Sequence, residues 1–120
     1  MNDNISLETV KGKFYAIRGQ SGAGKTTLLN LIGLLDTPTS GNVLIDNREV
    51  SQLTEKEKAK IRLTNIGFIF QEFYLNEALK AYENVMIPMI VNPFYKRAEI
   101  KRRACEILVI GVLSFAYHLR

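Results

Sequence analysis

The sequence predicts an α/β protein, and three observations carry this prediction. Segments of strand and helix character alternate along the chain, and a glycine-dense turn joins the first strand to the first helix. Hydrophobic residues make up 47% and charged residues 23% of the 120 residues, which is typical of a soluble globular chain and argues against disorder. This length predicts one modest core rather than several domains.

The first half begins with a strand that leads into a helix. The apolar run at residues 14–17 indicates a buried strand. After the glycine-dense turn, leucines at helical spacing predict a helix over residues 25–35 with a wide apolar face. Short strands are expected at residues 43–45 and 48–50, joined by a turn at Asp46-Asn47.

A second helix and a central strand are expected next. Thr54 and Glu57 have the spacing of a capping box, in which each side chain bonds the backbone amide of the other residue. The charged helix that follows should end near Leu63. The apolar run at residues 66–70 has strand length and is predicted to be a central strand.

The last third is predicted to be helical. Residues 83–86 fit one or two helical turns that stop at Pro88. Asn92-Pro93 has the polar cap and first-turn proline of a helix start, so a helix is expected over residues 95–110, with Gly111 near its end.

The charge is unevenly distributed. Residues 1–91 hold ten basic and ten acidic side chains, so the net charge of +4 arises from residue 92 onward. A surplus this small does not indicate nucleic acid. The basic cluster of Lys96-Arg97 and Lys101-Arg102-Arg103 fits a solvated helix face, with Glu99 pairing with Arg103. Contact with an anionic membrane or with acidic neighbours is the alternative.

The compartment predicted from the sequence is the cytoplasm. The chain has one cysteine, Cys105, which cannot form an internal disulfide and is expected to be buried. The longest apolar runs have seven residues, whereas a membrane-spanning helix needs about 20. The first residues do not have the pattern of a secretory signal.

The glycine-dense turn carries the chemistry. Gly19-x-x-x-x-Gly24-Lys25-Thr26 fits the Walker A phosphate loop in full, between a predicted strand and a predicted helix. Glycines allow the backbone amides to surround an anion at a helix N-terminus. Lys25 should reach the β- and γ-phosphates, and the Thr26 hydroxyl should bind Mg²⁺. The predicted phosphate-binding residues are Gly19, Gln20, Ser21, Gly22, Ala23, Gly24, Lys25, Thr26 and Thr27.

Further stretches carry a family resemblance. Residues 19–33, Pro38–Asp46, Ile66–Gln71 and Tyr82–Val85 together resemble the ATP-binding subunits of ABC transporters. The similarity is greatest to the branch that serves lipoprotein release and the export of macrolides and antimicrobial peptides. A small GTPase or nucleoside kinase is disfavoured, because no Asn-Lys-x-Asp guanine motif occurs.

This resemblance implies a fold, ligands and partners. The fold would be the P-loop NTPase fold of ABC ATPases, with a mixed sheet and flanking helices, and the ligands would be ATP and Mg²⁺. Gln71 would be the catalytic Q-loop glutamine that contacts Mg²⁺ and the attacking water. Residues 73–90 would receive a membrane-spanning permease subunit, and a second ATP-binding subunit would complete a dimer. The protein would be peripheral on the inner face of the cell membrane and would bind no nucleic acid.

The resemblance also implies that residues 1–120 are a partial nucleotide-binding domain, from the Walker A loop to just past the Q-loop helix region. The Leu-Ser-Gly-Gly-Gln signature, the Walker B aspartate, the catalytic glutamate and the switch histidine would follow Arg120. We therefore expect these residues to bind Mg-ATP with little turnover, while the complete protein hydrolyses ATP to energise transport. The alternatives are a truncated, non-hydrolysing nucleotide-binding module and a non-functional fragment.

Overall fold

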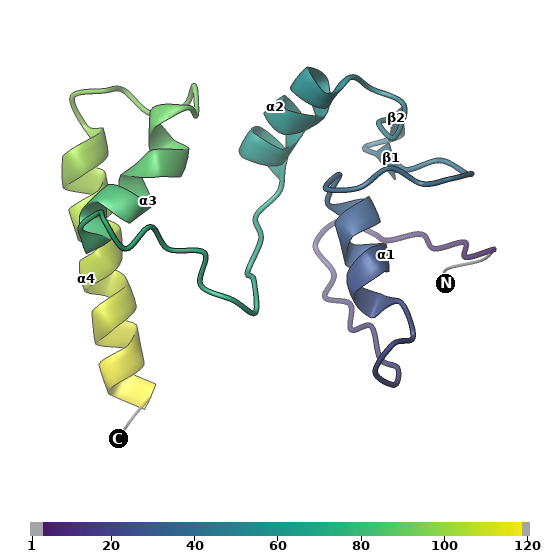
Figure 1. The fold of residues 1–120 in the computed structure, drawn as a ribbon, viewed down its shortest axis with the longest axis horizontal. Helices are drawn as coiled ribbons and strands as arrows, with labels where there is room; N and C mark the ends of the chain where they lie inside the picture. The colour runs from purple at the N-terminus through teal and green to yellow at the C-terminus, as the bar shows by residue number, and fades with distance from the viewer. Residues whose placement is uncertain (1–3, 119–120) are drawn as a thin grey trace. The chain divides into compact units, whose positions relative to one another are not determined.

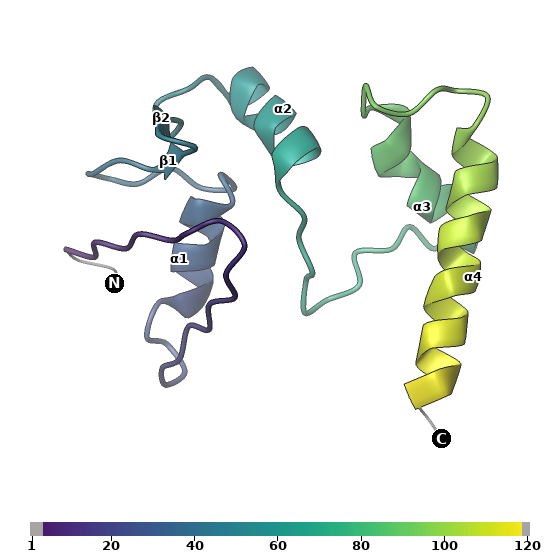
Figure 2. The ribbon, with the colours of Figure 1, turned by 180° about the vertical axis from the view of Figure 1, so that it is seen from behind.

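The computed structural model describes residues 4–118, and the side chains of residues 4–112. Two compact units form, one ending at Phe68 and one beginning at Ile69, and each is described by itself. Figures 1 and 2 show the elements of both units. They are α1 (Lys25–Ile32), β1 (Leu44–Ile45), β2 (Arg48–Glu49), α2 (Glu55–Asn65), α3 (Ala81–Ile90) and α4 (Ile100–His118).

The β1–β2 hairpin confirms the prediction made from the Asp46-Asn47 turn. The two strands are antiparallel, and the amide of Val50 donates to the carbonyl of Val43 at 2.9 Å, which extends the pairing by one step. Asp46 and Asn47 have φ angles of 49° and 62°. Positive φ at both central residues matches the right-handed twist of a two-residue hairpin, and Asp and Asn tolerate this conformation.

The strands predicted at residues 14–17 and 66–70 are wrong for this structure. Both segments lack regular secondary structure, Phe14 is 95% exposed and Ile69 is fully exposed. A strand needs a neighbour that accepts its backbone hydrogen bonds. Among the described residues the only strand pairing is that of β1 with β2, so an apolar run alone does not produce a strand here.

Helix α1 ends three residues earlier than its leucine spacing predicts. The amide of Gly33 donates to the carbonyl of Leu29 at 2.8 Å, and Leu34 then takes a φ of 58°. A residue in the left-handed region at this place ends a helix. Leu34 accepts this conformation while its side chain is almost completely buried, so packing decides where the helix stops.

Polar side chains of α2 hold the segment that follows α1. The Lys58 ammonium donates to the Thr37 hydroxyl at 2.8 Å and lies 3.6 Å from the Glu55 carboxylate. Arg62 donates to the backbone carbonyl of Leu34. Lys58 is buried, and its hydrogen bond and ion pair offset the cost of removing its charge from water.

The capping box predicted for α2 is present. The Thr54 amide donates to Glu57 Oε2 at 2.9 Å, and the Glu57 amide donates to Thr54 Oγ1 at 3.4 Å. The hydrogen bond from the Thr54 backbone lowers the pKa of Glu57 below its ordinary value of 4.5, and the Thr54 side chain adds to this effect.

The second unit is a pair of packed helices. α3 and α4 lie side by side (Figures 1 and 2), around a core of Met89, Ile100 and Ala104. The expected stop at Pro88 is wrong, because α3 continues to Ile90 and buries Met89. Packing of Met89 against α4 therefore outweighs the tendency of Pro88 to end the helix.

The start predicted for the last helix is also wrong. Asn92 Oδ1 accepts from the amide of Phe94 at 2.9 Å, and the Asn92 carbonyl accepts from Tyr95. Asn92 therefore makes a turn of its own, a common use of this side chain, and α4 begins only at Ile100. The helix then continues through Gly111, which was expected near its end.

Two surface expectations for α4 need correction. Arg103 makes its ion pair with Glu106, at 3.3 Å, rather than with Glu99. Cys105 is exposed rather than buried, because the face of α4 that packs on α3 is the one that carries Ile100 and Ala104.

Thr54→Ala should destabilise the N-terminal unit by about 1 kcal/mol, because it removes the side-chain half of the capping box. Urea unfolding followed by circular dichroism measures this change in the free energy of unfolding. An unchanged midpoint would contradict the role of the box.

The same box predicts a pH dependence. The folded pKa of Glu57 is lowered, so its stabilising contribution is present above its unfolded pKa and is lost as pH falls through the folded pKa. Lowering the pH from 6 to 3 should therefore destabilise the original chain more than Glu57→Gln, whose side chain does not titrate. Parallel loss in both proteins would contradict this assignment.

Candidate phosphate-binding site

The loop before α1 alternates in backbone handedness. Gly22 and Gly24 have φ angles of 80° and 86°, whereas Ser21, Ala23 and Lys25 do not have positive φ. Successive residues of opposite handedness turn their amide groups toward one side and form a concave anion-binding nest. The backbone of this loop therefore has the geometry that an anion site needs.

The glycines of this loop serve two different purposes. A Cβ atom on Gly22 would meet no heavy atom within 4 Å, so Gly22 is required for its positive φ and not for space. Gly19 does not have positive φ. A Cβ atom there would lie only 3.2 Å from the Cβ of Ala23, a tight contact, so the absence of a side chain at Gly19 allows the two ends of the loop to approach closely.

Helix α1 begins directly at the end of this loop. Gly24 is its N-cap residue, and its carbonyl accepts the first helical hydrogen bond, from the Leu28 amide at 2.9 Å. The helix has no side-chain cap and no acidic residue in its first turn. The positive end of the helix dipole is therefore not neutralised by the side chains of its own first turn.

The Lys25 side chain folds back over the loop. Its ammonium donates to the carbonyls of Gly19 and Gln20, at 2.7 and 2.6 Å. The amide of Ala23 also donates to the Gln20 carbonyl, at 3.1 Å. Lys25 therefore joins both ends of the loop and brings a positive charge to it. The side chains of Ser21, Thr26 and Thr27 are exposed, so their hydroxyls are accessible.

Gln71 belongs to the second unit. It follows Phe70 in a segment without regular structure and is exposed. The phosphate loop belongs to the first unit, and the positions of the two units relative to one another are not determined (Figure 1). Contact of Gln71 with Mg²⁺ and with the attacking water therefore stays a prediction.

The described residues contain neither a cluster of metal-binding side chains nor a membrane-spanning helix. Among the described residues, no group of three or more His, Cys, Asp and Glu side chains is placed to hold a metal ion. Within the same part of the chain, no helix has the length and apolar character needed to cross a membrane. A metal at the phosphate loop would instead use hydroxyl, amide and phosphate oxygens, which a hard cation such as Mg²⁺ prefers.

Asn84 is a positioning residue that the sequence analysis did not assign. Its Oδ1 accepts from the amide of Asn76 at 2.8 Å, and its Nδ2 donates to the carbonyls of Asn76 and Leu79. These bonds fasten the chain after Gln71 to the start of α3. An amide side chain is suited to this task because it both donates and accepts. The sequence signal for this role is the position of Asn84 within the helical turns predicted for residues 83–86.

Gly22→Ala should weaken binding of pyrophosphate about 5- to 30-fold. An L-residue pays roughly 1–2 kcal/mol to enter the left-handed region, and the binding conformation requires it to do so. Gly41→Ala is the matched control, because Gly41 also has positive φ and open space but lies outside the loop. Titration calorimetry on both variants measures the effect, and equal affinities would contradict the nest geometry.

Comparison with known proteins extends these findings beyond the loop. The chain matches the ABC transporter family over residues 2–112. It is 54% identical over 87 residues to the macrolide export ATP-binding/permease protein MacB of Campylobacter jejuni, covering 72% of this chain and 14% of that protein. It is 46% identical over 104 residues to the lipoprotein-releasing system ATP-binding protein LolD 1 of Rhodopseudomonas palustris, covering 87% and 46%.

A solved structure shows the same fold. The structure of the ATP-binding cassette MJ0796 bound to ADP and Pi is similar with a TM-score of 0.65 and 46% identity, over 72% of this chain and 38% of that one. The MJ0796 protein comes from Methanocaldococcus jannaschii. The chain thus spans about half the length of LolD 1 and a smaller share of MacB. The expected P-loop NTPase fold is confirmed, and the chain belongs to the ABC transporter family, within its ATP-binding cassette.

Proposed function

We propose that residues 19–27 bind the phosphate tail of ATP. The observation that carries this proposal is the alternation of handedness at Gly22 and Gly24, which continues directly into α1. It supplies backbone donors and the positive end of a helix dipole at one place, so an anion there can receive several hydrogen bonds at once.

Lys25 supplies the charge of this site. Its ammonium is held by two loop carbonyls, so it is already oriented before a ligand arrives. A phosphate oxygen at the nest would gain a charge-assisted hydrogen bond from it. These contacts also restrict the Lys25 side chain before a ligand binds, so less side-chain conformational entropy is lost on binding.

Mg²⁺ fits the residues that follow Lys25. The Thr26 hydroxyl is exposed in the first turn of α1, beside the proposed phosphate position. A hydroxyl, phosphate oxygens and water are oxygen ligands of the kind that Mg²⁺ binds. The ion would neutralise charge on the phosphates, and Gln71 is proposed to hold both the ion and the attacking water.

The complete protein is proposed to be the ATP-binding part of an exporter. This proposal is supported by the names of its relatives, which are a macrolide export protein, a lipoprotein-releasing system protein and a cassette solved as a dimer. Its partners would be a membrane-spanning permease and a second ATP-binding subunit, on the cytoplasmic face of the membrane. Hydrolysis of ATP belongs to that assembly, and we propose binding with little turnover for residues 1–120.

The permease is proposed to contact the segment that follows Gln71. This segment exposes Phe73, Tyr74 and Leu75. The ring of Tyr74 packs edge-to-face on that of Phe70, with 5.1 Å between the ring centroids. Exposed aromatic side chains are typical anchors of protein interfaces. Asn84 fastens the chain just after them, at Asn76.

Lys25→Ala should weaken Mg-ATP binding about 10- to 150-fold, because a hydrogen bond from a charged donor contributes about 1.5–3 kcal/mol. Titration calorimetry with ATP, with and without Mg²⁺, measures this loss. Lys13→Ala removes an equally charged, exposed lysine outside the loop and should leave the affinity unchanged.

Two outcomes would contradict the proposal. One is the absence of ATP binding by a chain whose circular dichroism shows the expected helices. The other is equal weakening by Lys25→Ala and Lys13→Ala, which would indicate attraction by overall charge. Rapid hydrolysis by residues 1–120 that Lys25→Ala abolishes would keep the site but overturn the proposal of little turnover.

A further inference from the structure

Residues 70–74, here called the Gln71 turn, end on an unusual backbone conformation. Tyr74 has a φ of 47°, in the left-handed region that bulky residues rarely enter. Among residues 4–118, three of the other non-glycine residues with positive φ are Asn or Asp, which tolerate this region. The fourth is Leu34, whose side chain is almost completely buried. Neither reason applies to Tyr74, which is 74% exposed.

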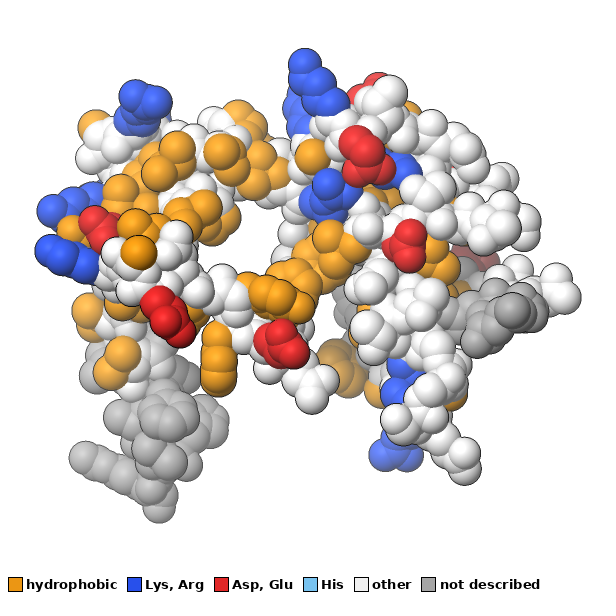
Figure 3. Space-filling model, in the orientation of Figure 1, with side chains coloured by type: hydrophobic (Ala, Val, Ile, Leu, Met, Phe, Trp, Pro, Cys, Tyr) orange, Lys and Arg blue, Asp and Glu red, His pale blue; other side chains and the backbone are white. Residues whose placement is uncertain are grey.

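A contact between two rings accompanies this conformation. The Tyr74 ring lies edge-to-face on that of Phe70, with 5.1 Å between the centroids and 79° between the planes. Exposed hydrophobic side chains are common on both units (Figure 3), so exposure by itself does not distinguish Tyr74. An extended chain would separate residues four apart by about 13 Å. The chain bends at Gln71 and Glu72, and this bend lets the two rings meet.

The strain and the ring contact are of similar size. The left-handed conformation lowers the population of an L-residue about 5- to 30-fold. An aromatic pair raises the population of the paired state about 2- to 12-fold beyond the effect of the area that it buries. Because the two effects oppose each other at this scale, loss of the ring contact should let Tyr74 leave the left-handed region.

The chain after the Gln71 turn is fixed independently of the rings. The Asn76 amide donates to Asn84 Oδ1 at 2.8 Å, and Asn84 Nδ2 donates to the Asn76 carbonyl at 3.1 Å. Asn84 belongs to α3, which packs on α4. A change of conformation at Tyr74 should therefore move the residues of the turn and leave the two helices in place.

We propose that Tyr74 is a positioning residue for Gln71, because its ring contact with Phe70 keeps the Gln71 turn closed against the strain of its own backbone. When the rings separate, Tyr74 relaxes to a negative φ and the orientation of Gln71 changes with the backbone of the turn. The turn is thus an element with two states. The consequence for catalysis rests on the function proposed for Gln71, whereas the two states themselves require no nucleotide.

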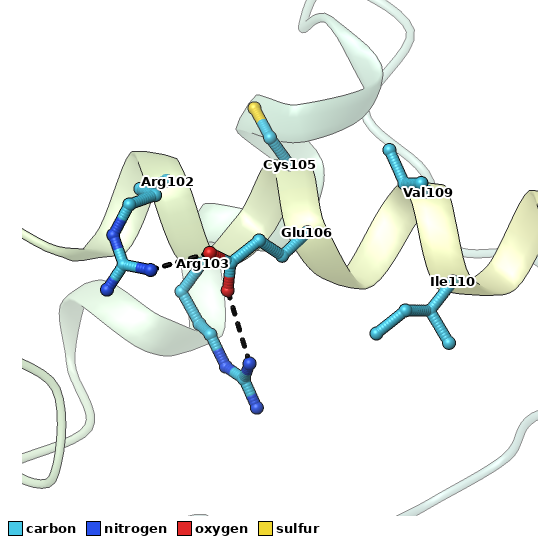
Figure 4. Close-up of a pocket in the computed structure, with 6 residues that line it drawn as sticks. All are labelled: Arg102, Arg103, Cys105, Glu106, Val109 and Ile110. Atoms are coloured by element: carbon cyan, nitrogen blue, oxygen red, sulfur yellow. Dashed lines mark hydrogen bonds and ion pairs between the residues drawn. The ribbon is translucent and has the colours of Figure 1, made fainter.

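The distance between two spin labels within the second unit tests the closed turn. One label is placed on Glu72→Cys, which is exposed in the turn. The other is placed on the natural Cys105, which is exposed in an open depression on α4, beside Arg102 and Val109 (Figure 4). Without nucleotide, pulsed electron paramagnetic resonance should give one narrow main population of distances, because the closed turn and α4 belong to one compact unit.

Substitutions at Tyr74 separate the ring from the strain. Tyr74→Ala removes the ring and keeps the strain, so the ratio of a second, broad population to the narrow one should rise about 2- to 12-fold. Tyr74→Phe keeps the ring and should retain the narrow population. Tyr74→Asn lacks the ring but tolerates the left-handed region, so its ratio should lie between those of the original chain and Tyr74→Ala.

Two further variants test whether the contact is specific. Phe73→Ala is the matched control, because it removes a ring that is 88% exposed in the same turn, and it should leave the distances unchanged. Phe70→Ala should act like Tyr74→Ala. The double variant of Phe70 and Tyr74 should broaden the distances no further than either single variant, because both break the same contact.

Four results would overturn the proposal. These are equal broadening by Tyr74→Ala and Phe73→Ala, loss of the narrow population in Tyr74→Phe, a ratio for Tyr74→Asn as high as that for Tyr74→Ala, and additive broadening in the double variant. Circular dichroism of each variant checks that the helices are retained. Titration with ATP separates this proposal from the proposed function, because a closed turn in a chain that binds no ATP would remove only the proposed function.

Discussion

The reversal of backbone handedness at Gly22 and Gly24 is the constraint on which the N-terminal unit depends. It turns an extended segment into the first turn of α1 within a few residues, and it leaves that helix without a side-chain cap. The features proposed for phosphate binding all follow from this geometry, namely the concave backbone, the helix dipole and the position of Lys25. Neither glycine can be replaced without strain, because an L-residue rarely adopts this conformation.

Hydrogen bonds from polar side chains hold much of the remaining structure together. Few apolar side chains are buried among the described residues, and the elements are joined instead by side chains that reach a neighbouring segment. Arg62 and Lys58 of α2 hold the segment after α1. Asn84 of α3 holds the segment after Gln71. The second set fixes the chain directly after Leu75, one of the residues proposed to contact the permease.

Features with a local cause could be predicted from the sequence. The capping box needs only residues three apart, and the hairpin turn needs only Asp46 and Asn47, so both were found correctly. The phosphate loop is also local, because glycine spacing specifies its backbone. Features that need a distant partner were predicted poorly. Residues 14–17 and 66–70 have strand composition but no strand neighbour among the described residues, and Pro88 does not stop a helix that buries Met89 against α4.

The sequence by itself determined the loop, its lysine, its family and the excess of positive charge after residue 91, because each is specified by residue types at short spacing. Only the tertiary structure decided where the helices begin and end and which face of α4 stays exposed. Those outcomes depend on which side chains Met89, Ile100 and Leu34 meet in space. Burial free energy is gained only when such distant contacts form, so no short stretch of sequence specifies it.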